Sequence, residues 1–165
     1  MTIQPTGLPR LQPPRGHTEP RFVQLAALCW RKGKAGAEVL LVTSSSGRWI
    51  LPKGWPIEGK SPAEAALTEA WEEAGVTRGK ASRKPVGSYI AIKRTPQGDD
   101  LPCLHRVYAV RVRDLADDFP EAHRRDRVWV SPAQAARMVD EEGLRDIRIV
   151  EAIYKSAASG KRVNL

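Results

Sequence analysis

Three glutamates, Glu69, Glu72 and Glu73, are spaced so that one helix would bring their carboxylates to a single face. Residues three and four apart are neighbours on a helix surface, so Glu69 would face both of the others. Like charges at this spacing destabilise an isolated helix by roughly a few tenths of a kcal/mol per pair, and a bound cation would relieve that repulsion. A solvated acidic face on a surface helix explains the same residues, and the triplet alone does not choose between the two.

The residues around the glutamates carry the start and stop signals of a helix. Ser61 is suited to the N-cap, Pro62 to the first helical turn, and Glu64 can reach back to the cap. Gly75 is suited to the stop. An apolar strand and the loop WILPKGWP, residues 49–56, lead into this helix. The side opposite the glutamates is slim enough to press against a sheet and is made of alanines: Ala66, Ala70 and Ala74.

Loop and helix together resemble the box of the Nudix hydrolase family, which reads Gly, five residues, Glu, seven residues, then Arg-Glu-aliphatic-any-Glu-Glu-any-Gly-aliphatic. Lys60 stands where the box has its first Glu, and Thr68 where it has Arg, a residue regarded in the family as a brace for the box carboxylates. Losing one member of a buried charge pair costs roughly 3 to 5 kcal/mol, whereas losing both can be nearly neutral. We therefore expect the two replacements to belong together, with Lys60 weakly paired to Glu64. The residues in register with the box are Gly54, Glu69, Ala70, Glu72, Glu73, Gly75 and Val76.

Further segments look like the diphosphoinositol polyphosphate and diadenosine polyphosphate hydrolase branch of this family. The resemblance implies an α/β fold, an alpha/beta/alpha sandwich with a mixed sheet. It also implies divalent-metal-dependent hydrolysis of a pyrophosphate bond in a highly phosphorylated small molecule of one of those two kinds. The segments are 26–31, 38–45, 48–54 and 126–135.

By the same resemblance, the metal site would consist of the Gly54 carbonyl with Glu69, Glu72 and Glu73. Mg²⁺ prefers oxygen ligands and needs few carboxylates when the substrate supplies phosphates, and Mn²⁺ can substitute. The same three glutamates are the candidate catalytic residues. Either one of these glutamates or an acid from a distal loop would serve as the general base. Glu121 is the candidate for that distal acid, with a plain surface acid as the alternative.

Cations near the same loop are candidates for binding phosphate, Arg as a bidentate fork and Lys as a point charge. Any one of them alone is explained as a solvated charge. Trp55 is expected to cover apolar surface rather than to stack on a base. The substrate-binding candidates are Arg48, Lys53, Lys93, Arg94, His105 and Arg106.

The charge balance favours polyanionic partners. Lys and Arg number 27 against 19 acidic residues, giving a formal net charge of +8. This charge does not separate a phosphate-rich metabolite from RNA, although no RNA-reading aromatic motif is present. Removal of pyrophosphate from 5′-triphosphorylated RNA, and a Nudix-like module that binds a nucleotide or protein without cleaving it, remain as alternatives. The oligomeric state is left open.

The remaining composition predicts one domain in a reducing compartment. The 165 residues contain no apolar run long enough to cross a membrane and no secretory signal pattern, so we expect a cytoplasmic protein without a membrane partner. Cys29 and Cys103 lie in apolar strands without a metal-ligand pattern and are expected to be buried, reduced thiols.

The chain divides into a flexible proline-rich arm at 1–20, a single Nudix hydrolase domain at 21–157 and a basic tail at 158–165. Gly33 and Gly36 mark a hairpin, and the 95–102 segment reads as a polar, turn-rich loop. Helices are expected from Ser61 to Gly75, from Ser131 to about Asp140, and over 145–157. The expected strands are 22–31, 38–45, 48–51, 85–94, 104–112 and 127–130.

Overall fold

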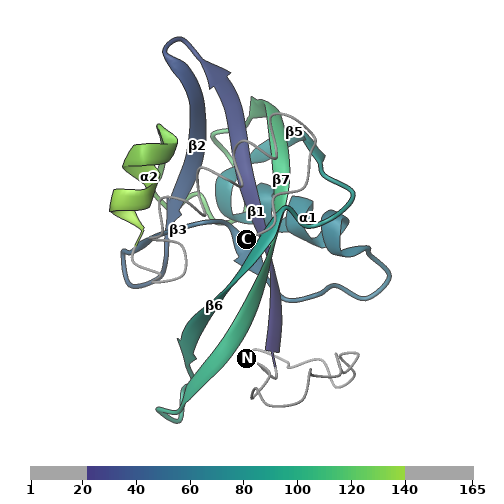
Figure 1. The fold of residues 1–165 in the computed structure, drawn as a ribbon, viewed down its shortest axis with the longest axis vertical. Coiled ribbons are helices and arrows are strands. Elements are labelled where there is room, and N and C mark those ends of the chain that lie inside the picture. The colour runs from purple at the N-terminus through teal and green to yellow at the C-terminus, as the bar shows by residue number, and fades with distance from the viewer. Residues whose placement is uncertain (1–21, 140–165) are drawn as a thin grey trace.

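In the part of the chain that the structure describes, eight strands form one mixed sheet with a helix packed on each face. Figure 1 shows how these elements are arranged. The computed structural model describes residues 22–139, so the predicted arm, the predicted helix at 145–157 and the basic tail lie outside the described residues. The elements are β1 (Phe22–Gly33), β2 (Gly36–Thr43), β3 (Trp49–Ile50), β4 (Lys53–Gly54), α1 (Pro62–Ala74), β5 (Val76–Ala81), β6 (Gly87–Arg94), β7 (Asp100–Leu115), β8 (Arg127–Val130) and α2 (Pro132–Met138).

The centre of the sheet is the parallel pair β1 and β7, which runs in register from Phe22 opposite Cys103 to Trp30 opposite Arg111. Every other pairing between these strands is antiparallel, and the main order is β3-β2-β1-β7-β5. The short strand β4 adds to β1, β6 adds to β7 and β8 adds to β2. The β6–β7 hairpin projects at the bottom of Figure 1 and the β1–β2 hairpin at the top.

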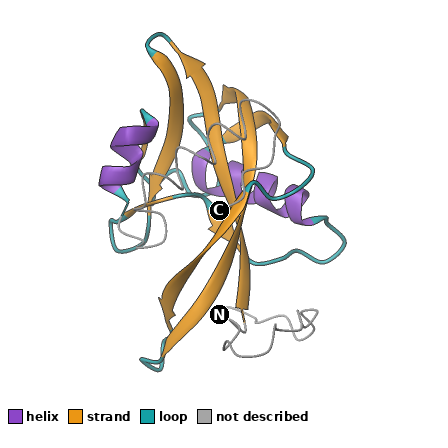
Figure 2. Cartoon of the chain, viewed as in Figure 1, coloured by secondary structure: helices purple, strands orange, loops and turns teal. Residues whose placement is uncertain are grey.

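Alternation along the strands gives the sheet two apolar faces, each covered by one described helix (Figure 2). On one face, Leu25 and Ala27 of β1 belong to the same cluster as the alanines of α1. On the other, Ala26 and Leu28 belong to the cluster that contains Ala135 of α2. The expected α/β class, an alpha/beta/alpha sandwich with a mixed sheet, is therefore confirmed. The buried alanines of α1 are Ala65, Ala66, Ala70 and Ala74.

The predicted capping of α1 is present. The Ser61 hydroxyl accepts from the Glu64 amide at 3.2 Å, while the Glu64 carboxylate accepts from the Ser61 amide at 2.7 Å. Gly75 adopts φ of 75° and donates to the carbonyls of Ala70 and Trp71, which ends the helix. These caps fix where the box helix begins and ends against the sheet.

Three segments differ from the expectation. Residues 76–81, which carry little apolar pattern, form β5 by pairing with β7. Residues 53–54, expected as loop, form β4 against β1. The segment expected as a loop at 95–102 ends earlier, since β7 begins at Asp100 opposite Arg94 of β6. In each case a neighbouring strand supplies hydrogen bonds that local composition does not announce.

The two cysteines are placed as expected, because Cys29 and Cys103 are both buried and neither forms a disulfide. Burial raises the pKa of Cys29 to about 12, so this thiol stays protonated at neutral pH. Over the range 22–139, no helix is long and apolar enough to cross a membrane.

Candidate active site

Gly54 and Glu69, two of the predicted metal ligands, lie against each other. The pairing of Gly54 with Leu25 fixes strand β4 beside β1, and α1 packs across it. A Cβ atom at Gly54 would overlap the carboxylate of Glu69. Only glycine therefore lets the backbone of β4 approach the carboxylate this closely.

Glu73 joins the same strand from the next turn of the helix. Its carboxylate accepts from the Lys53 amide at 3.2 Å and from the Arg125 guanidinium at 2.8 Å. The residue is only 6% exposed. The buried carboxylate is thus held between β4 and the segment that precedes β8.

The loop between β7 and β8, residues 116–126, docks on the last turn of α1 and brings Glu121 to the site. The Glu121 amide donates to the Glu72 carbonyl at 3.0 Å, and the Ala116 amide donates to the Gly75 carbonyl at 2.8 Å. Arg127 of β8 links the loop to the end of the helix by donating to the carbonyls of Ala116 at 2.7 Å and Ala74 at 2.8 Å. The prediction that an acid from this distal loop reaches the box glutamates therefore has a structural basis, while its role as a base stays a proposal.

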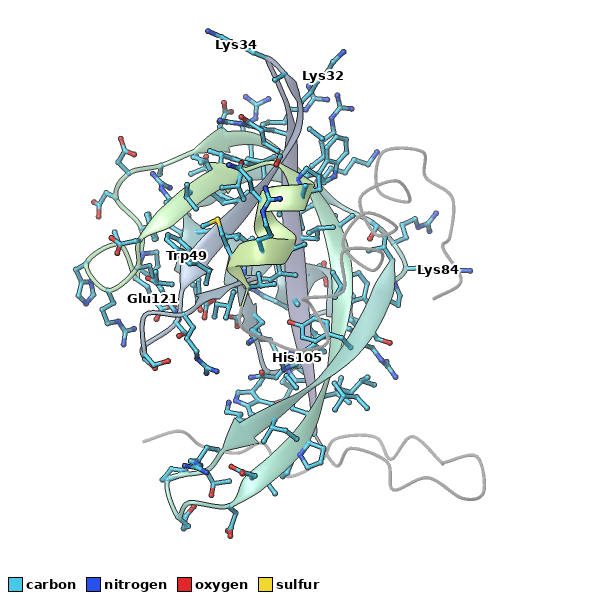
Figure 3. All side chains as sticks on the ribbon, turned by 60° about the vertical axis from the view of Figure 1, so that its left-hand side comes forward. Lys32, Lys34, Trp49, Lys84, His105 and Glu121 are labelled. Carbon is cyan, nitrogen blue, oxygen red and sulfur yellow. The ribbon has the colours of Figure 1, made fainter. Side chains whose placement is uncertain are left out.

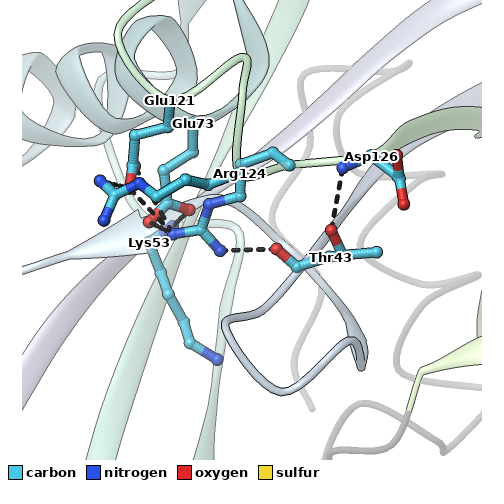
Figure 4. A network of polar contacts seen from close by, with 7 residues as sticks. Thr43, Lys53, Glu73, Glu121, Arg124 and Asp126 are labelled. Carbon is cyan, nitrogen blue, oxygen red and sulfur yellow. Dashed lines mark hydrogen bonds and ion pairs between the residues drawn. The ribbon is translucent and has the colours of Figure 1, made fainter.

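Arg125, which the sequence analysis did not single out, links these groups. One nitrogen of its guanidinium donates to the Thr43 carbonyl at 2.6 Å, and the other donates to Glu73 at 2.8 Å and lies 3.5 Å from both oxygens of Glu121. In Figure 4 the carboxylates of Glu73 and Glu121 lie close together, with Thr43 on the other side of the network. In the sequence, residues 123–126 (HRRD) were counted only toward the net charge, because no local pattern distinguishes the role of Arg125 from that of its neighbour Arg124.

Burial and nearby negative charge raise the pKa of two box carboxyls, those of Glu69 and Glu73, toward neutral pH. Burial, followed by the charges of Glu73, Glu72 and Glu121, raises the pKa of Glu69 to about 7. Burial also raises the pKa of Glu73 to about 7, against the opposing effect of Arg125 and the Lys53 amide. Groups with these values release protons when a cation binds them.

The carboxylates of the glutamates and the Gly54 carbonyl suit a hard divalent cation, because all are oxygen ligands. The close approach of the Gly54 backbone to Glu69 would let both bind the same ion. Among residues 22–139, no three acidic, histidine or cysteine side chains already converge on one point. Glu73 accepts hydrogen bonds from the Lys53 amide and from Arg125, and Glu121 accepts one from Arg124 at 2.6 Å.

Two of the predicted phosphate-binding cations gather beside the box. The Lys93 ammonium lies 4.3 Å from the centre of the Trp55 ring, and burial with the nearby charge of Lys53 lowers its pKa. Trp55 in turn contacts Phe22 edge to face at 6.0 Å between ring centres, so it covers apolar surface as expected. Lys53 and Lys93 together form a cationic corner next to Gly54.

The other four candidates are placed differently. Arg48 is exposed in the turn before β3, where it contacts Ser46, and Arg94 pairs with Asp100 across the β6–β7 hairpin at 3.0 Å. His105 is 2% exposed and packs against Tyr89, inside the body of the protein in Figure 3. These positions do not support phosphate contacts by His105 or Arg94. Arg106 is half-buried on β7 opposite Ser88.

Comparisons with known proteins agree with this geometry. The chain is 33% identical over 122 residues to Nudix hydrolase 16, mitochondrial, of Arabidopsis thaliana, covering 72% of this chain and 66% of the relative. It is 34% identical over 118 residues to human diphosphoinositol polyphosphate phosphohydrolase 3-alpha, covering 69% of this chain and 66% of the relative. In both cases the match spans slightly less than two thirds of the relative's length.

Solved structures show the same fold. A Caenorhabditis elegans Ap4A hydrolase in a binary complex superposes with a TM-score of 0.58 at 17% identity, covering 84% of this chain and 98% of that chain. A NUDIX hydrolase from Nitrosomonas europaea superposes with a TM-score of 0.60 at 19% identity, covering 89% and 94%. The NUDIX domain family model matches residues 22–152. The resemblance noted in the box is thereby confirmed, and the chain belongs to the NUDIX domain family.

Proposed function

We propose that this protein is a divalent-metal-dependent pyrophosphohydrolase acting on a highly phosphorylated small molecule, either a diphosphoinositol polyphosphate or a dinucleoside polyphosphate. The observation that carries the proposal is that Gly54 lies against Glu69, while Glu73 and Glu121, whose charges act on Glu69, share Arg125. The relatives named for diphosphoinositol polyphosphates and the Ap4A hydrolase neighbour support the substrate class.

In the proposed site, Gly54, Glu69, Glu72 and Glu73 would hold Mg²⁺ or Mn²⁺. The bound ion supplies neutralisation of phosphate charge and lowers the pKa of a bound water. The chain's own part is to keep these carboxylates close despite their repulsion. Burial of Glu73 beneath Arg125 and the tight approach of β4 to Glu69 achieve this.

Glu121 is proposed as the general base. The oxygen of an attacking water forms a bond to phosphorus, its proton passes to the Glu121 carboxylate, and the bridging P–O bond breaks with its electron pair on the leaving phosphate. The Glu121 side chain is 18% exposed, so solvent reaches it while its backbone stays anchored on Glu72. The cationic corner of Lys53 and Lys93 is proposed to bind the phosphates that do not react.

The test is a turnover assay with Mg²⁺ or Mn²⁺ on diadenosine polyphosphates, diphosphoinositol phosphates, nucleoside triphosphates and triphosphorylated RNA. We expect selective phosphate release from one of the first two classes, lost on chelation and in Glu73→Gln. Glu58→Gln is the matched control, because Glu58 is an exposed acid of the loop before α1 and should leave turnover unchanged.

Other outcomes would replace the proposal. Preference for triphosphorylated RNA would make the protein an RNA 5′-pyrophosphohydrolase. Tight binding that survives chelation, without turnover of any substrate, would make it a binding module. Cytoplasmic location remains our prediction, and fractionation of cells tests it, since the names of some relatives carry the word mitochondrial.

A further inference from the structure

We propose that Arg125 is a positioning residue, which supplies from the β7–β8 loop the cation that the box helix of this chain does not contain. It would orient Glu73 for metal binding and hold Glu121 beside it. This inference rests on the proposed function, because it assigns a role within the same site. It concerns the arrangement of carboxylates and can be tested without turnover.

The box helix lacks a cation of its own. Helix α1 reads PAEAALTEAWEEA and holds no Lys or Arg. The position at which the family's box has Arg is Thr68, whose hydroxyl accepts from the Lys60 ammonium at 2.8 Å and donates to the Glu64 carbonyl at 2.9 Å. Both contacts lie on the exposed side of the helix, so neither braces the buried carboxylate of Glu73.

Arg125 is buried against Glu73. Its side chain is 13% exposed and faces that of Glu73, which is 8% exposed. The guanidinium spans from the Thr43 carbonyl at the end of β2 to the Glu73 carboxylate, with contacts of 2.6 and 2.8 Å. A planar fork with several donors can make both contacts at once, whereas the single ammonium of Lys cannot span them in the same way. The carboxylate is therefore tied to a strand of the sheet.

Arg125 also lies close to Glu121. The nitrogen that binds Glu73 lies 3.5 Å from both oxygens of Glu121, so one guanidinium stands between two carboxylates that would repel each other. The neighbouring Arg124 contacts Glu121 at 2.6 Å, but its own side chain is 63% exposed. Among the residues that the structure describes, Arg125 is thus the cation whose position keeps the carboxylates of Glu121 and Glu73 together.

The experiment compares Arg125→Lys with Arg127→Lys. Arg127 anchors the same loop but donates to the carbonyls of Ala74 and Ala116 and to Asp117, so its variant reports on loosening of the loop alone. The readouts are the affinity for Mn²⁺ alone, measured by calorimetry, the melting temperature, and kcat and KM on the substrate that the wild type cleaves.

We expect Arg125→Lys to weaken Mn²⁺ binding and to lower kcat, each by about 10- to 100-fold, as loss of an outer partner of a metal ligand does. KM should change by less than about threefold, because the proposed role is not a substrate contact. Arg127→Lys should lower the melting temperature yet keep Mn²⁺ affinity within about threefold of the wild type.

Two results would overturn the proposal. A raised KM with unchanged Mn²⁺ affinity would show that Arg125 binds the substrate directly. An equal loss of Mn²⁺ affinity in Arg127→Lys would show that anchoring of the loop is sufficient. If Arg125→Lys does not fold, Arg125→Gln takes its place with the same expectation. If the wild type cleaves nothing, the proposed function fails, and the Mn²⁺ affinities still decide the role of Arg125.

Discussion

The Lys60 ammonium donates a hydrogen bond to the Thr68 hydroxyl at 2.8 Å, so the two positions at which this chain departs from the family's box touch each other. The expected weak pairing of Lys60 with Glu64 is present beside this contact, because hydrogen bonds from Ser61 and, as a smaller cause, the charge of Lys60 lower the pKa of Glu64. The two replacements therefore belong together as an exposed hydrogen bond from a cation to a hydroxyl.

Because this contact is exposed, we expect little to depend on it. Lys60→Glu, Lys60→Met and Thr68→Val should each change the free energy of unfolding by less than about 0.5 kcal/mol. Turnover should stay within about threefold of the wild type, since neither residue touches the box carboxylates. Urea denaturation and the turnover assay measure these effects. Loss of activity in Lys60→Glu would mean that the contact between Lys60 and Thr68 contributes to the site.

Glu69→Gln should stabilise the metal-free protein while removing most turnover. Burial and three neighbouring carboxylates disfavour the charged form of Glu69, so a neutral side chain of the same shape relieves repulsion. Allowing for its partial exposure, we expect a gain of about 1 to 2 kcal/mol at pH 8. Thermal melts in chelator measure it, with Glu58→Gln as the control. If Glu69→Gln were less stable than the wild type, repulsion between Glu69 and its neighbouring carboxylates would not be the dominant effect.

The metal-free protein should lose stability as the pH rises from about 4.5 to about 7. Below pH 4.5 the carboxyls of Glu69 and Glu73 are mostly protonated in both the folded and the unfolded state. Between these values the unfolded chain releases protons that Glu69 and Glu73 retain in the folded state, so unfolding becomes more favourable. Above about 7 this penalty is fully present. Melts of the wild type and of the Glu69→Gln/Glu73→Gln double variant should therefore differ by an amount that grows across this window and then levels off.

Metal should reverse that trend. Mg²⁺ binds deprotonated carboxylates, so its binding releases protons from Glu69 and Glu73 and grows stronger as they ionise. We expect saturating Mg²⁺ to raise the melting temperature more at pH 8 than at pH 5.5. An equal shift at both pH values would place the stabilising ion elsewhere on the protein.

Gly54→Ala should disturb the site through one atom. The added Cβ would overlap the Glu69 carboxylate, and forcing extra volume into a packed position costs about 1 to 3 kcal/mol. In a Glu69→Ala background the carboxylate is gone, so the same change should cost less. Urea denaturation of the four proteins in this cycle measures the difference. Equal costs in both backgrounds would refute the close approach of Gly54 to Glu69.

Local rules in the sequence were enough for the box helix and its orientation. Ser61, Pro62, Glu64 and Gly75 define its ends through contacts within one turn, and the alanine side predicts the face that meets the sheet. The long apolar strands were equally readable, because alternation along β1 separates the two faces of the sheet. Strand β5 was missed because its hydrogen bonds come from β7, whose paired residues lie far away in the sequence, as Val76 opposite Leu115 shows.

The sequence by itself determined the acidic triplet, its helix and, through the box, the family and reaction class to test. Only the tertiary structure decided which cation balances the buried charge. Arg124 and Arg125 are adjacent and chemically identical in the sequence, yet one is 63% exposed and the other 13%. That difference arises because docking of the β7–β8 loop on α1 brings residues some fifty positions apart into contact, and burial then makes their charges interact strongly.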